Sequence, residues 1–462
     1  MRFLAVLLIA GCTTLGPDYQ RPELTLPAEY PVATSAGETS VDAAWWRLFN
    51  DAALTELVDA ARTHNADLRL AVARVQEAEA LAREARGAFL PEVSGSYSAT
   101  RNRVSTRTEP PPTATAGLER EQHTLSASTN FELDFWGRFA RANEAARANL
   151  LASELSREVV ALSLAGTTSQ AYFALRSLDA QIAVLENTIR VRRDSLAIAQ
   201  ARAEAGLASE LDVHQAQGAL SDALVQQREA RRSRALVERQ LAQLSGRLDL
   251  KIVPGDLFAL PVPPTPPAGL PSSLLARRPD IRAAEEGLVA ANAQIGVARA
   301  ALFPTISLTA ALGTQSAEFS TLLSSGAGIW TLGFGLALPL FDAGRRAARV
   351  DQAQARREQS LVNYQRSIET GFREVADALV NVEQSGGAEG ELAARLEAAR
   401  NALELSRIRY ESGYSPYLEV LDAQRTANDA ELAFVRNRQA RLAFSVDLMR
   451  ALGGGWSEKP KY

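Results

Sequence analysis

The residues that most often carry chemistry are scarce in this chain of 462 residues. The histidines, His64, His123 and His214, lie far apart in the sequence, and Cys12 is the single cysteine. The sequence contains no phosphate-binding glycine loop and no spacing typical of metal ligands. Because an enzyme needs several catalytic groups that converge on one place, we predict a protein that is not an enzyme and binds no cofactor.

Cys12 is a candidate for a different reaction, the attachment of a lipid. It follows an apolar stretch, residues 3–10, with a single positive charge before it at Arg2, as in an export signal. The tetrapeptide IAGC that ends at Cys12 resembles the lipobox of bacterial lipoproteins, which implies removal of residues 1–11 and a covalent lipid, including palmitate, on the cysteine. Thr13 resembles the pattern that directs such lipoproteins to the outer membrane. We therefore expect a lipid tether, which anchors a protein without spanning the membrane.

Two distant stretches, GLASELDVHQAQ at 206–217 and GYSPYLEVLDAQ at 413–424, resemble each other. Each begins with a glycine, which suits the end of a helix, and contains a serine that can cap the next helix. Each therefore predicts a tight turn between two antiparallel helices, with a capping box in the first turn and a proline in the first helical position of the second. The residues assigned to these turns are Gly206, Ser209 and Asp212, and Gly413, Ser415 and Pro416.

Very long helices flank these turns. Between about Arg138 and Glu204 the sequence has no proline and one glycine, Gly166, which predicts a rod of roughly 100 Å at 1.5 Å per residue. A second long helix is predicted from about Gly344, with a bend or break where residues 385–387 place two adjacent glycines.

The hydrophobic pattern changes to a period of two in four places. Residues 125–135 alternate apolar and polar side chains, as a strand with one apolar and one polar face does. A weaker alternation precedes them, and residues 301–316 and 329–341 repeat the arrangement later in the chain. Each pair predicts a hairpin.

The chain therefore consists of two copies of the same unit. After the signal at 1–11 and an extended, proline-containing strap at 12–45, the first copy spans 46–248 and a proline-rich connector spans 249–277. The second copy spans 278–453 and a tail spans 454–462. The first copy is a helix, a hairpin at 92–136, a long helix at 138–205 and a helix at 209–245. The second is a helix, a hairpin at 304–341, a long helix at 344–412 and a helix at 415–452.

The strands are the candidates for crossing a membrane, because no stretch after the signal has 18 uninterrupted apolar residues. Two hairpins give four strands, whose open edges lipid does not tolerate. Several chains must then share one barrel, since the smallest membrane barrels have about eight strands. A soluble coiled coil with incidental strands is the alternative.

A net charge of −4 without a basic stripe argues against nucleic acid as a partner.

Several motifs together resemble one family, the trimeric outer-membrane channels of Gram-negative bacteria that are similar to TolC, in particular the lipoprotein branch of RND-type drug efflux. The motifs are PDYQRP after Cys12, WWRLFNDAALTELVDAARTHNADLRLA, RRPDIRAAE, ALFPTISL and LPLFDAGRRAA. The resemblance implies a mainly α-helical fold in which three chains form a twelve-stranded barrel that continues into a helical periplasmic barrel. It also implies a passive exit duct, involved in antibiotic resistance, whose partners are a periplasmic adaptor and a proton-driven pump of the inner membrane.

The same resemblance implies a gate at the helix tips, in the stretch YLEVLDAQRT. Leu418 resembles the family's apolar plug, Asp422 its acidic ring and Arg425 a basic partner. Glu419 and Tyr410 fall where related channels place an acid and a tyrosine, whereas Ser415 replaces an arginine of TolC. The alternative for Asp422 and Arg425 is an ordinary surface pair on one helix.

Two other functions share this architecture. A duct for type I protein secretion would differ mainly in its partners, and a structural or adhesive outer-membrane lipoprotein would conduct nothing.

Overall fold

The computed structural model describes residues 14–23, 41–105, 107, 118–267, 274–454 and 456. Cys12 and the predicted signal at 1–11 lie outside the described residues, as do parts of the predicted strap, first hairpin, connector and tail. The chain divides into two compact units. The first contains the strap at 14–23 with residues 76–152 and 284–364, and the second contains residues 41–75, 153–283 and 365–456 as far as they are described.

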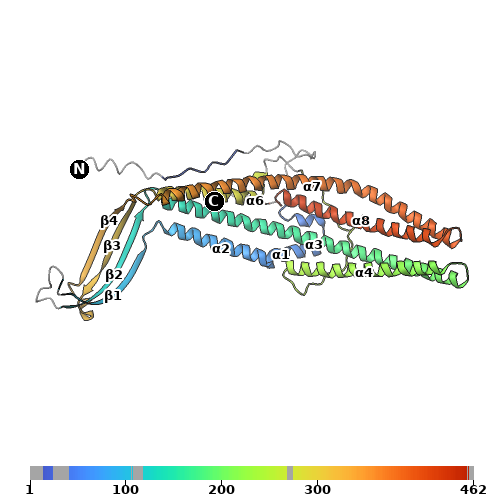
Figure 1. Ribbon diagram of the computed structural model, residues 1–462, viewed down its shortest axis with the longest axis horizontal. Helices are drawn as coiled ribbons and strands as arrows, with labels where there is room; N and C mark the ends of the chain where they lie inside the picture. Colours follow the sequence, from blue (N-terminus) through green and yellow to red (C-terminus); the bar gives the residue numbers. More distant parts are fainter. Residues whose placement is uncertain are drawn as a thin grey trace. The chain divides into compact units, whose positions relative to one another are not determined.

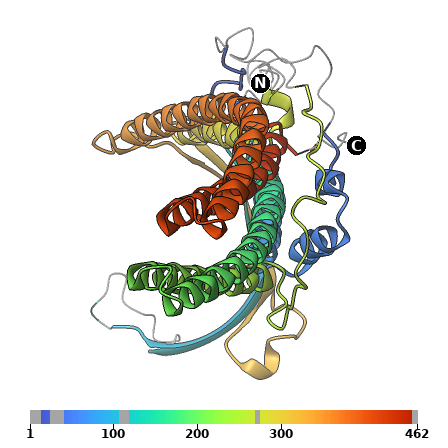
Figure 2. The same cartoon turned by 90° about the vertical axis from the view of Figure 1, so that its right-hand side faces the viewer.

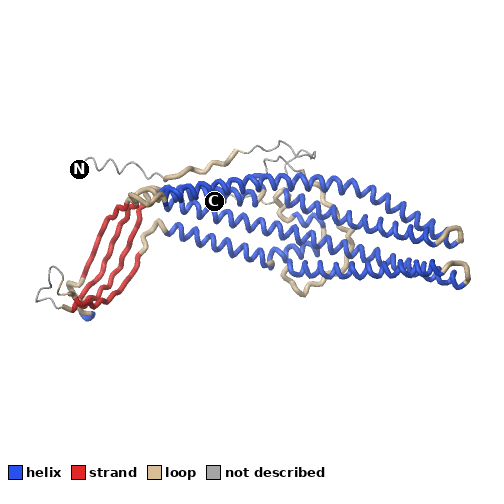
Figure 3. Tube along the Cα trace, in the orientation of Figure 1, coloured by secondary structure: helices blue, strands red, loops and turns tan. Residues whose placement is uncertain are grey.

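One four-stranded antiparallel sheet dominates the first unit (Figures 1 and 3). Its strands are β1 (Val93–Arg103), β2 (Glu119–Leu133), β3 (Thr305–Ser316) and β4 (Gly328–Ala337), in this spatial order. A short 3-10 turn, η3 (Phe319–Thr321), lies between β3 and β4. Both predicted hairpins form, and they are joined where β2 pairs with β3. The edges of β1 and β4 have no partner strand within the described chain.

The register of the sheet separates apolar from polar side chains. Pairing of Leu125 with Thr314, of Phe131 with Leu308 and of Leu308 with Phe334 places these side chains on one face. The same face carries Val93, Tyr97, Ile306, Leu312, Trp330, Leu332 and Leu336. The opposite face carries serine, threonine, asparagine and glycine at most positions. The alternation predicted for residues 125–135 is therefore confirmed.

The strap at 14–23 is held along the first unit by side-chain contacts. Arg21 donates two hydrogen bonds, of 2.7 and 2.6 Å, to the carboxylate of Glu285. Arg141 donates to Asp18 at 2.6 Å and to the carbonyl oxygen of Leu15 at 3.3 Å. Gly16 lies so close to the helix beside it that a Cβ atom there would approach the Cα of Gly296 to 2.6 Å. This part of the predicted strap is thus a docked segment.

Long helices supply most of the remaining structure. The helices α3 (Arg138–Glu204) and α7 (Arg345–Glu411) have 67 residues each, and α4 (Glu210–Leu244) and α8 (Tyr417–Ala451) have 35 each. Of the bend or break predicted at residues 385–387, the break is wrong, because α7 continues through these residues. There the carbonyl oxygen of Ser385 accepts a hydrogen bond of 3.2 Å from Asn437 on α8. Packing against α8 thus outweighs a glycine penalty of about 1 kcal/mol per residue.

The single helix predicted before the first hairpin is divided into two, whereas the one predicted before the second hairpin is undivided. In the first copy, α1 (Ala52–His64) and α2 (Ala66–Gly87) are separated at Asn65, which has an extended backbone. The Asn65 side chain accepts a hydrogen bond from the backbone N–H of Asp67 at 2.8 Å and donates one to the carbonyl oxygen of Leu244 at 3.0 Å. In the second copy the predicted helix is α6 (Pro279–Ala300), which begins with a proline, and the short α5 (Leu274–Arg277) lies in the predicted connector.

The main core of the second unit gathers aromatic side chains from distant parts of the chain. The 3-10 helix η1 (Trp45–Phe49) packs on Phe173 of α3, with ring centroids of Phe49 and Phe173 4.8 Å apart. Leu241 of α4 and Val446 of α8 belong to the same cluster, and so does Leu257 of the connector. The predicted connector therefore contributes to the core.

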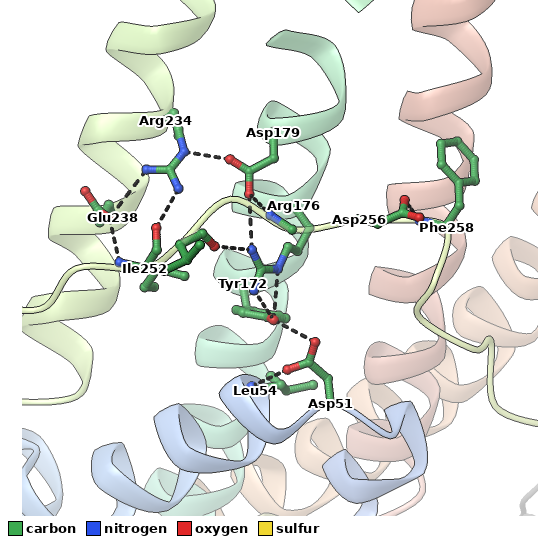
Figure 4. Close-up of polar contacts among 12 residues, drawn as sticks. Asp51, Leu54, Tyr172, Arg176, Asp179, Arg234, Glu238, Ile252, Asp256 and Phe258 are labelled. Atoms are coloured by element: carbon green, nitrogen blue, oxygen red, sulfur yellow. Dashed lines mark hydrogen bonds and ion pairs between the residues drawn. The ribbon is translucent and has the colours of Figure 1, made fainter. Parts of the chain in front are cut away.

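A buried polar network fastens this connector to α3 and α4 (Figure 4). Asp179 accepts hydrogen bonds from Arg176 at 3.2 Å, from Arg234 at 2.6 Å and from the backbone N–H of Gly255 at 3.1 Å. Both arginines also donate to connector carbonyl oxygens, Arg176 to Val253 and Arg234 to Ile252, each at 2.7 Å.

Tyr172 extends the network to α1. Its hydroxyl donates to Asp51 at 2.8 Å and accepts from Arg176 at 2.7 Å, while Asp51 caps α1 through the backbone N–H of Leu54 at 2.8 Å. Burial is the main cause that raises the pKa of Tyr172 above its usual range. Four segments far apart in sequence are therefore connected by one set of charged hydrogen bonds.

Candidate functional site

The turn between α3 and α4 is closed by glycine, as predicted. Gly206 has a positive φ of 73°, which only glycine adopts readily, and the next backbone N–H, of Leu207, donates to the carbonyl oxygen of Arg202 at 2.7 Å. The Ser209 hydroxyl caps α4 by accepting from the backbone N–H of Leu211 at 3.1 Å. The backbone N–H of Asp212 donates to the carbonyl oxygen of Ser209 at 3.0 Å, and among the described residues the Asp212 carboxylate makes no return bond to Ser209. Ser209 therefore caps the helix as predicted, but the predicted capping box does not form.

The turn between α7 and α8 differs from the prediction at its second part. Gly413 has a φ of 80° and closes α7, but Pro416, with φ −71° and ψ 158°, is itself the N-cap of α8. Ser415 therefore does not cap the helix, and its buried hydroxyl has no hydrogen-bond partner. When the two stretches are aligned at Gly206 and Gly413, Pro416 is the counterpart of Ser209, and Ser415 is the counterpart of Ala208.

The two turns lie close to each other within the second unit (Figure 2). A small core joins them, in which Ala199 of α3 and Ala216 of α4 pack with three residues of α7 and α8. These three are Tyr410, Tyr417 and Val420. The hairpin α3–α4 is thus packed against the hairpin α7–α8 at their ends.

Two tyrosines occupy this core. Tyr410 is 5% exposed and its ring centroid lies 5.5 Å from that of Tyr417. Burial raises the pKa of Tyr417 to about 12, and burial together with the negative charge of Asp212 raises the pKa of Tyr410. Both hydroxyls are buried without a hydrogen-bond partner. Both groups are therefore held in the neutral form.

The three central residues of the predicted gate share one stripe of α8. Leu418, Asp422 and Arg425 follow one another at intervals of four and three residues, which places them on the same side of a helix. All three side chains are exposed in the single chain, Leu418 at 59%. Within the described residues no ion pair joins Asp422 to Arg425. The stripe is therefore available to another molecule.

Glu419 and Tyr410 do not belong to this stripe. Glu419 forms an ion pair of 3.0 Å with Arg409 across the α7–α8 turn, and Tyr410 lies in the core between the hairpins. Sequence reasoning missed both Arg409 and Arg202, which stand four residues before Gly413 and Gly206. Arg202 and Arg409 occupy equivalent positions in the two copies, and this repetition could have identified them.

Comparison with known proteins assigns this architecture. The family model described as outer membrane efflux protein matches residues 57–247 and 270–454. The chain belongs to the outer membrane efflux protein family. The solvent efflux pump outer membrane protein SrpC of Pseudomonas putida is 36% identical over 98% of this chain and 97% of its own length. The cation efflux system protein CusC of Escherichia coli (strain K12) is 33% identical, with 98% of each chain covered.

Solved structures agree with the sequence relatives. The CmeC outer membrane channel of Campylobacter jejuni superposes with a TM-score of 0.88 at 26% identity, covering 97% of this chain and 96% of its own. Membership of the outer membrane efflux protein family confirms the expected fold class, the location in the outer membrane and the function as an exit channel of an efflux system. It also confirms that the protein is a channel and not an enzyme.

Two further observations concern the described residues only. None of their helices has both the length and the apolar character needed to cross a membrane. No group of three or more metal-ligating side chains occurs among them.

Proposed function

We propose that three copies of this chain close one twelve-stranded barrel in the outer membrane, through which small molecules leave the cell. The observation that carries this proposal is the sheet of the first unit, which has one apolar face, one polar face and two edges without a partner strand. In lipid such edges must be paired, and pairing β4 of one copy with β1 of the next satisfies them. The apolar face then meets lipid and the polar face lines the channel.

We infer that the duct is passive and works with a periplasmic adaptor and a proton-driven pump of the inner membrane. The sequence has no nucleotide-binding motif that could energise transport. The relative SrpC is named as part of a solvent efflux pump, which favours small molecules over proteins as cargo.

The gate of this duct is assigned to the stripe on α8. In a threefold assembly, three Leu418 side chains around the axis would exclude water, and three Asp422 carboxylates would repel one another unless a cation or Arg425 lies close. The exposure of all three residues in the single chain supports this assignment, because an axial plug must lie outside each chain's own core.

The lipid anchor is assigned to Cys12. The docked strap supports the assignment, because Leu15, Pro17 and Asp18, a few residues beyond Cys12, accept hydrogen bonds from the first unit. The tether between the lipid and the folded chain is then short. Mass spectrometry of the protein extracted from membranes should show a diacylglyceryl group on a chain that begins at Cys12, and Cys12→Ser should remove it. An unmodified amino terminus would reject the anchor.

Planar-bilayer conductance tests channel and gate together. We compare the wild type with Asp422→Ala combined with Arg425→Ala. The control combines Arg373→Ala with Asp377→Ala, which removes an exposed ion pair of 3.1 Å elsewhere on α7. We expect small, mostly closed conductance in the wild type and the control, and large conductance in the gate variant. Equal conductance in all three would remove Asp422 and Arg425 from the gate, and no conductance in any would reject the channel.

A further inference from the structure

Arg202, in the last turn of α3, reaches across to the other hairpin. Its Nη1 atom donates to the carbonyl oxygen of Tyr410 at 3.0 Å and to that of Glu411 at 3.3 Å. Its guanidinium carbon also lies 4.9 Å from the centroid of the Tyr410 ring. One side chain of α3 thus contacts the end of α7 in three ways.

The chemistry of this contact suits the end of a helix. Tyr410 and Glu411 are the last two residues of α7, where carbonyl oxygens have no following helical turn to pair with and carry partial negative charge. The carbonyl oxygen of Tyr410 also accepts from the backbone N–H of Gly413 at 3.0 Å, so Arg202 adds a second donor there. An arginine supplies a permanent positive charge with several donors, and its flat face stacks on an aromatic ring. Arg202 therefore serves α7 as a cap that comes from another hairpin.

The internal repeat shows that this is not the only arrangement available to such an arginine. Arg409 occupies the equivalent place in the second copy, and it pairs at 3.0 Å with Glu419 of its own hairpin. The counterpart of Glu419 in the first copy is Asp212, which could pair with Arg202 in the same manner. Among the described residues, Arg202 has no ion pair with Asp212. The arginine of the first copy therefore joins two hairpins, whereas that of the second stays within one.

We propose that Arg202 is a positioning residue of the gate, which holds the α7–α8 turn against the end of α3 and so keeps the channel closed. This rests on the proposed gate at Leu418 and Asp422. Those residues lie in the first two turns of α8, directly after the turn that Arg202 fixes. Loss of the Arg202 contact releases that turn and frees the start of α8. The closed state is then destabilised relative to the open state, because only the closed state depends on this contact.

The experiment measures single-channel open probability of the reconstituted full-length protein. Arg202→Met keeps most of the side-chain volume but removes the charge and every donor, and we expect it to raise open probability roughly tenfold. Arg202→Lys retains a charged donor near the α7 carbonyl oxygens and should stay close to the wild type. The matched control is Arg409→Met, which removes an arginine at the equivalent place and should stay near the wild-type value.

The gate variant, Asp422→Ala with Arg425→Ala, is recorded beside them, and thermal unfolding of each trimer is measured in parallel. An unchanged open probability of Arg202→Met, with opening of the gate variant, would overturn the role of Arg202 and leave the gate intact. No opening in the gate variant would instead reject the gate itself. Equal opening in Arg202→Met and Arg409→Met would show that any arginine lost near the turns loosens them, and would also overturn the proposal.

Discussion

Asp179 offers a sharp test of how the second unit is held together. Its side chain is 4% exposed and it is the carboxylate between Arg176 and Arg234 (Figure 4). Asp179→Asn keeps the shape of the side chain but leaves two largely buried guanidinium groups facing a neutral amide. Breaking a buried ion pair by neutralising one partner typically destabilises a protein by about 3–5 kcal/mol, because an uncompensated charge remains inside.

A matched substitution gives the scale for this effect. Glu186 also lies on α3 and also pairs with an arginine of α4, Arg231, at 3.0 Å, but its side chain is 54% exposed. Exposed pairs contribute about 0–1 kcal/mol. We therefore expect Glu186→Gln to cost about 1 kcal/mol or less, and Asp179→Asn several times more.

Urea unfolding of the detergent-solubilised protein compares the two variants. Tryptophan fluorescence is a suitable signal because Trp45 and Trp46 belong to the core beside the network. If Asp179→Asn lowered the unfolding midpoint no more than Glu186→Gln does, the reasoning would be refuted. The connector carbonyl oxygens of Ile252 and Val253 would then suffice to satisfy both arginines.

Two further predictions concern the tyrosine core and the strap. The folded-state pKa of Tyr417, about 12, exceeds the usual 10, so the folded protein keeps a proton that the unfolded chain loses first. Stability should therefore fall as pH rises from about 10 to 12, and Tyr417→Phe should flatten this part of the profile of unfolding midpoint against pH. Gly296→Ala would place a Cβ 2.6 Å from the carbonyl oxygen of Leu15, whereas Gly287→Ala on the same helix meets nothing within 4 Å. Limited chymotrypsin digestion should accordingly cleave after Tyr19 of the strap faster in the first variant only.

Local patterns predicted the elements of this fold well. The alternation at residues 125–135 defines which face of β2 is apolar, and the register then extends that face to all four strands. The freedom from proline between Arg138 and Glu204 matches the bounds of α3. These features depend on residues that are close in the sequence, and so they can be predicted from a single sequence.

Contacts between distant segments were beyond such reasoning. The extended backbone at Asn65 is stabilised by a hydrogen bond to Leu244, and the continuity of α7 at Ser385 by one from Asn437. The chain has 50 basic and 54 acidic residues, so each arginine has many possible partners. No local pattern predicts that Arg202 contacts the end of α7 instead of Asp212. Only the packed arrangement of the hairpins decides these partners.

The two turns also show why similar sequences need not do the same work. Leu211 and Leu418 are equivalent and almost equally exposed, at 60% and 59%, so an apolar side chain is available on both hairpins. Four residues further on the copies diverge, since Gln215 of the first copy stands where the second has Asp422. At this position a ring of carboxylates around a threefold axis can therefore come from α8 but not from α4, whose acids Glu210 and Asp212 lie earlier in its first turn. In the proposed gate, movement of α8 would therefore change the electrostatic barrier, and fixing the turn before α8 through Arg202 would control the channel.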